Sequence, residues 1–95
     1  MYSKKTSSLY SCKAENMLKL LGKKWSSSIL KKFSIDKKEL SFTELKKDLN
    51  ISQKILDQRL KELEKYDILE KNDHYHITEL GLKINEIVYE LEKLF

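Results

Sequence analysis

The near absence of the two residues that most often interrupt helices constrains this chain more than any other feature. Its 95 residues include no proline and only two glycines, Gly22 and Gly81. Two glycines are too few for the Gly-rich loops that hold phosphates in nucleotide enzymes, or for the many tight turns of a β-sandwich. Because no proline breaks the backbone hydrogen-bond ladder, the sequence predicts a small, mainly helical domain.

Length, hydropathy and cysteine use narrow the class of protein. Ninety-five residues are enough for one domain. No apolar run approaches the length that spans a bilayer, and the first residues lack the apolar stretch of a secretion signal. A single cysteine, Cys12, cannot form an internal disulfide, as is usual in a reducing compartment. We expect a cytoplasmic protein with no membrane contact and no cofactor.

Basic charge is concentrated in one half of the chain. Residues 1–40 hold ten lysines and three acids, a net charge of +7, whereas residues 41–95 hold nine basic residues and twelve acids, a net charge of −3. This segregation favours an anionic partner, although a lysine-rich chain can also simply solvate its helices.

Apolar residues at helical spacing and stretches of alternating residues predict the order of the elements. Residues 1–10 are polar and rich in Ser and Lys, which predicts a flexible tail before a folded domain at 11–95. Residues 34–40 are predicted to form a charged connector. Helices are expected at about 12–21, 25–33, 42–49, 53–66 and 79–95, with a short hairpin at 68–71 and 74–77.

Capping residues fix several of these boundaries. Ser41 and Glu44 have the capping-box spacing at the start of the third helix. Ser52 follows a break at Asn50 and caps the fourth helix, Thr78 caps the last one, and Gly22 ends the first.

Two helices joined by so short a turn and followed at once by a hairpin have the plan of a winged helix-turn-helix. The predicted fold is therefore mainly α with a small β-hairpin (α+β): about five helices and a two- to three-stranded wing sheet. The second helix of the pair, at 53–66, is the expected recognition helix.

Several short segments, in order, resemble the HxlR-type family of winged-helix transcription regulators. After the amino-terminal cysteine, the matching segments are Gly22-Lys23-Lys24-Trp25 with Ile29-Leu30, Phe42-Thr43-Glu44-Leu45, Ile51-Ser52-Gln53-Lys54-Ile55-Leu56, Arg59-Leu60-Lys61-Glu62-Leu63-Glu64 and Tyr75-His76-Ile77-Thr78-Glu79-Leu80-Gly81. The chain departs from the family at Lys13, Lys23 and Ser41, where a proline, a second glycine and an arginine are usual. Its wing is also shorter, with Asn72-Asp73 at the tip. The resemblance implies a homodimeric regulator that binds double-stranded DNA.

The outward face of the fourth helix supplies the candidate base contacts. At about 100° per residue, with the apolar stripe centred on Leu63, this face is polar, and Ser52 and Gln53 lie near its start. Gln can pair with adenine, Lys can donate to guanine, and a serine at a helix start can meet a phosphate. The expected recognition residues are Ser52, Gln53, Lys54, Asp57, Gln58 and Lys61, although an amphipathic helix with a solvated face has the same pattern.

Other basic and polar residues are candidates for contacts to the DNA backbone. Arg59 projects to the edge of the apolar stripe, about 40° from its centre, and fits a structural role as well as a phosphate contact. The full candidate set is Lys23, Lys24, Thr43, Lys46, Lys47, Arg59, Asn72 and His74. His74 and His76 alternate on one strand, but two ligands are too few for a closed zinc site, so we expect no metal.

Cys12 and the last helix bear on regulation and assembly. In several members of the resembling family, a cysteine at the place of Cys12 senses oxidants or electrophiles, and its basic neighbours here favour a thiolate. A buried, inert Cys12 is the alternative. In the last helix, the stripe Leu80, Ile84, Ile87, Val88, Leu91 and Leu94 is expected to cover the core. The residues expected at a dimer interface are Leu9, Tyr10, Leu82, Tyr89, Leu94 and Phe95.

The sequence thus predicts a sequence-specific transcription regulator that acts as a homodimer on a palindromic operator, with an unknown oxidant or small-molecule effector. The alternative is a winged-helix module that docks on a protein partner and does not bind specific DNA. An enzyme is not expected, because the chain has no Gly-rich loop and its carboxylates lie along helices at salt-bridge spacing, such as Glu62 with Lys65.

Overall fold

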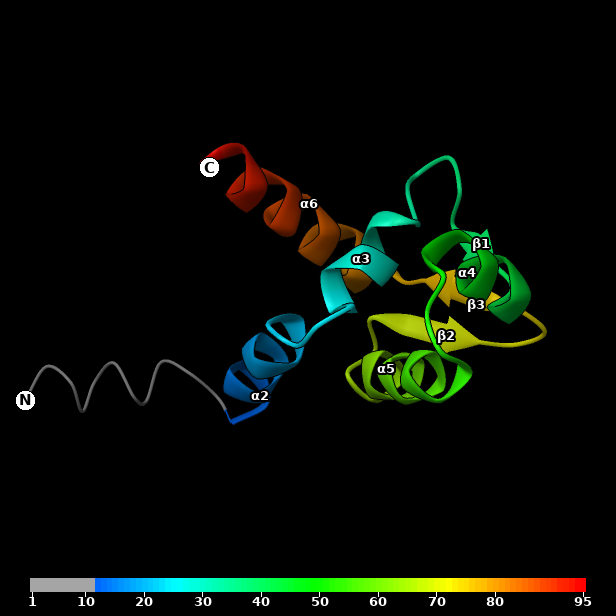
Figure 1. Ribbon diagram of the computed structural model, residues 1–95. Helices are drawn as coiled ribbons and strands as arrows, with labels where there is room; N and C mark the ends of the chain where they lie inside the picture. The colour runs from blue at the N-terminus through cyan, green and yellow to red at the C-terminus, as the bar shows by residue number, and fades with distance from the viewer. Residues whose placement is uncertain (1–11) are drawn as a thin grey trace, which may run out of the picture.

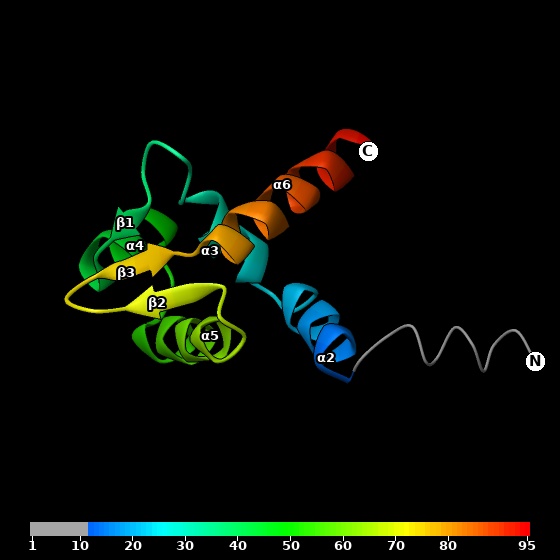
Figure 2. The ribbon, with the colours of Figure 1, turned by 180° about the vertical axis from the view of Figure 1, so that it is seen from behind.

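The computed structural model describes residues 12–95, which form five helices and a three-stranded antiparallel sheet. Along the chain the elements are α2 (Cys12–Leu21), α3 (Ser26–Lys31), β1 (Glu39–Leu40), α4 (Phe42–Leu49), α5 (Gln53–Lys65), β2 (Leu69–Lys71), β3 (Tyr75–Ile77) and α6 (Glu79–Lys93). Figures 1 and 2 show α4, α5 and the sheet grouped together, with α2 and α6 extending away from them on one side. The predicted winged helix-turn-helix with about five helices is confirmed.

Local capping sets the ends of the helix-turn-helix pair, α4 and α5. The Ser41 side chain accepts from the Glu44 amide at 3.0 Å, and the Glu44 carboxylate accepts from the Ser41 amide at 3.0 Å. Asn50 ends α4 in the left-handed conformation, with φ of 52°, and Ser52 caps α5 by accepting from the Ile55 amide at 3.3 Å. The expected break and capping residues are therefore confirmed.

One continuous core lies where the helices meet the sheet. The apolar stripe of α5, Leu56, Leu60 and Leu63, is fully buried, as its helical spacing predicts. The remaining buried apolar residues are Leu20, Ile29, Leu30, Phe33, Leu40, Leu45, Ile51, Ile68, Leu69, Tyr75, Ile77 and Ile84. Trp25, expected in the core, is half-buried at its margin.

The wing is a hairpin of β2 and β3 to which β1 adds a third strand. β3 is central, and Glu39 and Glu70 lie on opposite sides of His76 in the register. The Asn72 amide donates to the His74 carbonyl at 3.0 Å and closes the tip. Residues 39 and 40, expected in a connector, are therefore paired with β3, a long-range contact that two residues of local sequence do not signal.

The turn between α2 and α3 begins at Gly22, which ends α2 as predicted but does not adopt the left-handed conformation of a glycine cap. Neither glycine has a positive φ. The left-handed residue is Trp25, with φ of 80°, which precedes the first residue of α3. A bulky side chain in this conformation is strained, so other contacts must hold it there.

The prediction of the core-facing side of α6 was correct for Ile84 and Val88 and wrong for the rest of the stripe. Leu80, Ile87, Leu91 and Leu94 are exposed, whereas Gly81 and Ile84 are buried and Val88 packs partly against the core. The Asn85 side-chain amide donates to the carbonyls of Leu30 and Phe33 at 2.9 and 3.1 Å. A glycine and an asparagine therefore belong to the packed face, and a hydrophobicity pattern does not identify either of them.

Candidate nucleic-acid interface

The outward face of α5 is polar and open to solvent. Ser52, Gln53, Lys54, Gln58 and Lys61 are exposed, and Asp57 is half-buried. The structure thus presents all six predicted recognition residues along one helix, beginning at its capped amino terminus. This surface has donors and acceptors of the kind that read base edges, with free amides at the helix start for a phosphate.

The lysines of α5 differ in whether they form an ion pair within the protein. Lys61 Nζ lies 3.1 Å from Asp57 Oδ2, so these side chains restrain each other. Among residues 12–95, Lys54 has no ion-pair partner, and Lys65 lies 5.9 Å from the ring of Tyr66. The expected pairing of Lys65 with Glu62 is wrong, because Glu62 binds other cations.

Glu62 holds two of the candidate phosphate-binding residues. Its Oε2 accepts from Lys23 Nζ at 2.7 Å, and its Oε1 accepts from Arg59 Nη1 at 2.9 Å. Arg59 Nε also donates to the Lys24 carbonyl at 3.0 Å, and the Arg59 side chain is only 16% exposed. Burial acts to raise the pKa of Glu62, but the hydrogen bonds and charges of Lys23 and Arg59 hold this pKa below its ordinary value.

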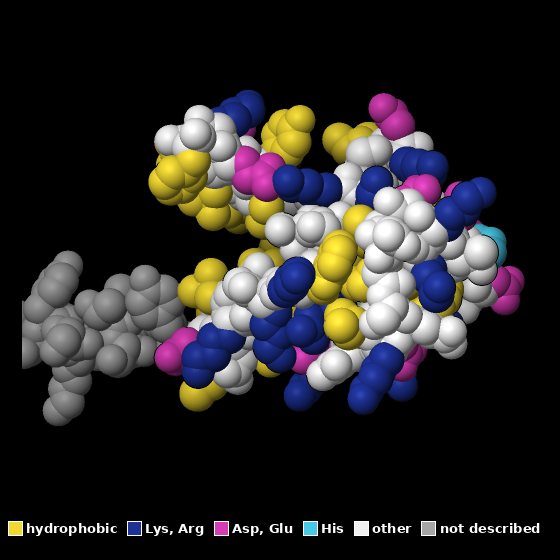
Figure 3. Space-filling view, in the orientation of Figure 1, with side chains coloured by type: hydrophobic (Ala, Val, Ile, Leu, Met, Phe, Trp, Pro, Cys, Tyr) yellow, Lys and Arg dark blue, Asp and Glu magenta, His cyan; other side chains and the backbone are white. Residues whose placement is uncertain are grey.

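The other backbone candidates lie on α4 and the wing. Thr43, Lys46 and Lys47 are exposed on α4, and Lys24 is exposed in the α2–α3 turn, 5.6 Å from the Trp25 ring centroid. Figure 3 shows Lys and Arg side chains along its lower side, over α5 and the α2–α3 turn. Exposed basic residues therefore lie on α4, on α5 and in the α2–α3 turn.

One glutamate, Glu39, lies beside both histidines of the wing sheet. His74 Nε2 lies 3.8 Å from Glu39 Oε2, and His76 Nδ1 lies 4.0 Å from Glu39 Oε1. Asn72 and His74 are both exposed near the tip, as a backbone contact would require. Within residues 12–95, no group of three or more acidic, histidine or cysteine side chains is arranged to hold a metal ion.

Hydrogen bonds with Ser41 stabilise the charged form of Glu44. The hydrogen bonds from the Ser41 backbone and side chain, aided by the charges of Lys37 and His74, lower the pKa of Glu44. The start of α4 therefore carries a carboxylate beside the candidate phosphate contact Thr43.

The candidate dimer residues fall on different faces. Leu9 and Tyr10 lie outside the described residues. Leu82 packs partly against the core, whereas Tyr89, Leu94 and Phe95 are exposed. Cys12 is exposed as the first residue of α2, which makes its thiol accessible within the described chain and argues against the buried alternative.

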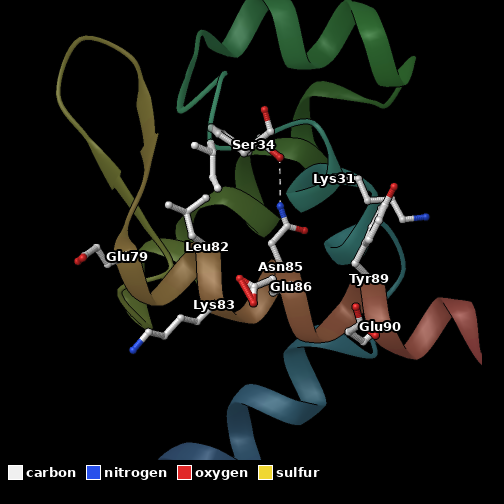
Figure 4. A pocket seen from close by; sticks show the side chains of 11 residues that line it. Lys31, Ser34, Glu79, Leu82, Lys83, Asn85, Glu86, Tyr89 and Glu90 are labelled. Carbon is white, nitrogen blue, oxygen red and sulfur yellow. Dashed lines mark hydrogen bonds between the residues drawn. The ribbon is translucent and has the colours of Figure 1, made fainter.

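A groove of about 830 Å³ lies between the end of α3 and α6. Figure 4 shows Leu82 and Tyr89 on its two sides and Asn85 between them, bonded toward α3. Two of the candidate dimer residues thus line this groove and do not belong to the exposed stripe of α6.

Sequence reasoning missed Glu62 and Glu39 as organisers of the site. Glu62 follows Arg59 by three residues, a spacing that permits contact on a helix and could have indicated that pair. Lys23 lies 39 residues away, and Glu39 meets the histidines only through strand pairing, so no local pattern indicates either contact.

A capped helix-turn-helix with an exposed polar second helix and a three-stranded wing defines a winged helix-turn-helix DNA-binding domain. The model of the HxlR-like helix-turn-helix family matches residues 20–95, and the chain belongs to this family. Membership confirms the predicted transcription regulator and the expectation that the chain is not an enzyme.

Solved structures give the same result. Quinone-bound YodB from B. subtilis is 34% identical, with 88% of this chain and 96% of that chain covered and a TM-score of 0.77. A possible HxlR family transcriptional factor from Thermoplasma volcanium is 26% identical over 81% of this chain and 75% of that one, with a TM-score of 0.73. Reduced HlyU from Vibrio cholerae shares the fold, with a TM-score of 0.66. It is 23% identical, and the match covers 96% of this chain and 97% of that chain.

No curated protein matches the sequence significantly. In the structure, none of the helices within residues 12–95 is long and apolar enough to cross a membrane.

Proposed function

We propose that this transcription regulator binds a palindromic operator sequence-specifically as a homodimer, with α5 as the recognition helix. The observation that carries the proposal is the exposed face of α5, where Ser52 to Lys61 present amide, hydroxyl and charged groups on the second helix of the pair. Bound near a promoter, such a dimer acts by occluding or recruiting polymerase.

Readout rests on lysine and glutamine, because the only arginine is engaged within the protein. Gln53 and Gln58 have the side chain that pairs with adenine, and Lys54 and Lys61 have donors for guanine. Ser52 and the free amides at the start of α5 meet a phosphate. A protein partner would need an apolar patch on this face, which is instead mainly charged and amide, so the docking-module alternative is disfavoured.

Exposed side chains on the neighbouring elements position the duplex through its backbone. The proposed contacts are Lys24 in the α2–α3 turn, Thr43, Lys46 and Lys47 on α4, and Asn72 and His74 on the wing. Asn72 is uncharged and His74 lies beside Glu39, so these two wing residues add little to DNA binding.

The homodimer is supported by the exposed apolar stripe of α6. Leu80, Ile87, Leu91 and Leu94 recur on one side of the helix, and the last three are 60%, 53% and 74% exposed. Figure 3 shows hydrophobic side chains gathered on the side of α6 that faces α2. Leu18, which belongs to α2, is also exposed. A second copy placed against this stripe would cover it and pair the two recognition helices.

Cys12 is proposed as the redox- or electrophile-responsive residue. Its thiol is exposed at the start of α2, the helix that would join α6 in the dimer interface. The related regulator YodB from B. subtilis has been solved in reduced, diamide-treated and quinone-bound forms, which supports this proposal for Cys12. Modification at Cys12 would act on the dimer and through it on the spacing of the recognition helices.

The decisive experiment is a fluorescence-anisotropy titration of the DNA upstream of the protein's own gene, at several salt concentrations. If about six phosphates are neutralised, log K falls with log salt at a slope near −5. Competitor DNA of scrambled sequence should bind at least about a hundredfold more weakly, a threshold set about tenfold below the lower end of the usual specific preference. A flat salt response, or equal affinity for both duplexes, would refute the proposal.

A further inference from the structure

Glu62 lies where α5 meets the turn between α2 and α3. One carboxylate oxygen accepts from Lys23 in the turn, and the other accepts from Arg59 on α5. Arg59 in turn donates to the Lys24 carbonyl, so two hydrogen bonds, of 2.7 and 3.0 Å, join the recognition helix to this turn, and the 2.9 Å bond between Arg59 and Glu62 within α5 links them. The bonded residues are 39 and 35 residues apart in sequence.

The turn that Glu62 and Arg59 hold is strained. Trp25 has a φ of 80°, and it directly follows the carbonyl that Arg59 binds. Ser26 is fully buried, and its Oγ donates to the Leu20 carbonyl at 2.7 Å, which fixes the other side of the turn. Because a strained backbone persists only where its surroundings determine it, these bonds, together with the buried stripe of α5, fix how α5 is oriented relative to α2 and α3.

The same contacts engage two cations at the edge of the DNA-reading face. At about 100° per residue, Glu62 lies about 100° to one side of Leu63, next to the outward face of α5. Lys23 is 45% exposed and would reach solvent freely without its carboxylate partner. A free lysine beside DNA neutralises a phosphate in any sequence, so it raises affinity without adding discrimination.

We propose that Glu62 is a specificity-determining positioning residue, which orients α5 through Arg59 and keeps Lys23 from contacting phosphate. The discrimination between operator and other DNA then rests on the side chains of α5 itself. This inference rests on the proposed role of α5 as the recognition helix.

The test compares Glu62→Gln with Glu64→Gln, which removes the same charge from the same helix. Glu64 lies about 100° to the other side of Leu63 and has no ion pair among residues 12–95, so it is a matched control. Wild type and both variants are titrated against the upstream duplex and a scrambled duplex of equal length, at several salt concentrations. Circular dichroism and thermal unfolding establish that each variant is folded.

Glu62→Gln should bind the scrambled duplex about fivefold more tightly near 0.1 M salt, the effect of one added exposed charge contact. Its salt slope should steepen by about 0.9 as Lys23 neutralises a phosphate. Preference for the upstream duplex should fall by about fivefold or more, whereas Glu64→Gln should keep it within about twofold.

Lys23→Gln provides the second arm, and it does not depend on whether Glu62→Gln folds. In the wild-type background it should leave the salt slope unchanged, and combined with Glu62→Gln it should restore the wild-type slope. A slope that falls by about one in Lys23→Gln alone would show that Lys23 already contacts phosphate, and would overturn the inference. Equal effects of Glu62→Gln and Glu64→Gln would also overturn it.

The outcomes separate this inference from the function on which it rests. A wild-type protein that binds neither duplex would refute the proposed function and this inference together. Wild-type selectivity that survives unchanged in Glu62→Gln would refute the role of Glu62 alone.

Discussion

Replacing Gly81 by alanine should destabilise the domain, although alanine is the better helix former. Gly81 is the third residue of α6, where helix propensity favours alanine by about 1 kcal/mol. A Cβ at this position would collide with the Ile68 carbonyl oxygen and the Ile77 side chain. The collision with backbone is the severe one, because the Ile68 carbonyl also accepts from the Thr78 amide and hydroxyl, both at 3.1 Å.

The size of the effect follows from these opposing contributions. Overpacking a tight core contact costs about 1–3 kcal/mol, and a fixed carbonyl places Gly81→Ala near the upper end. With the propensity gain of about 1 kcal/mol subtracted, the free energy of unfolding should fall by about 2 kcal/mol. For a domain of this size, the melting temperature should fall by about 10 °C.

Gly22→Ala is the matched control. A Cβ there would lie 3.6 Å from the carbonyl oxygens of Leu18 and Lys19, an ordinary contact, and Gly22 has no positive φ. We expect its free energy of unfolding to stay within about 0.5 kcal/mol of wild type. Urea unfolding at fixed protein concentration measures both variants. A Gly81→Ala protein as stable as Gly22→Ala would refute the packing argument.

Three further predictions concern assembly, redox response and pH. Leu91→Glu puts a charge in the exposed stripe of α6 and should give a monomer in light scattering at micromolar concentration. Ile35→Glu changes an exposed residue outside the stripe and should remain dimeric. A wild-type protein that is monomeric under these conditions would contradict the proposed dimer. Diamide should weaken operator binding by wild type and not by Cys12→Ser, and identical responses would remove Cys12 as the sensor. Because the folded-state pKa of Glu62 lies below its ordinary 4.5, its ion pairs stabilise the fold above that pH and are lost as pH falls further. The melting-temperature difference between wild type and Glu62→Gln should therefore be present at pH 6 and shrink below about pH 4.5, and a difference independent of pH would contradict this.

Features with a local cause were predicted correctly. The starts of α4, α5 and α6 coincide with Ser41, Ser52 and Thr78, because each side chain accepts a backbone amide three residues ahead. The buried stripe of α5 follows from its helical spacing in the same way. The exposed recognition residues are the complement of that stripe, so most of the candidate site could also be placed.

Features that join distant segments could not be read from the pattern. Hydrophobic spacing identifies an apolar stripe on α6 but cannot say whether the domain or a second molecule covers it. The orientation of α6 is set by the close approach of Gly81 to Ile68 and by the Asn85 amide bonded to α3.

The sequence by itself thus determined the elements, their order and the polar face of the recognition helix, because caps and periodicity act within a few residues. Only the tertiary structure decided that Arg59 and Lys23 are held by Glu62, that β1 joins the wing, and that Leu80, Ile87 and Leu91 of α6 remain exposed. The physical reason is that each of these depends on how separate elements pack, and packing brings together residues that no local spacing connects.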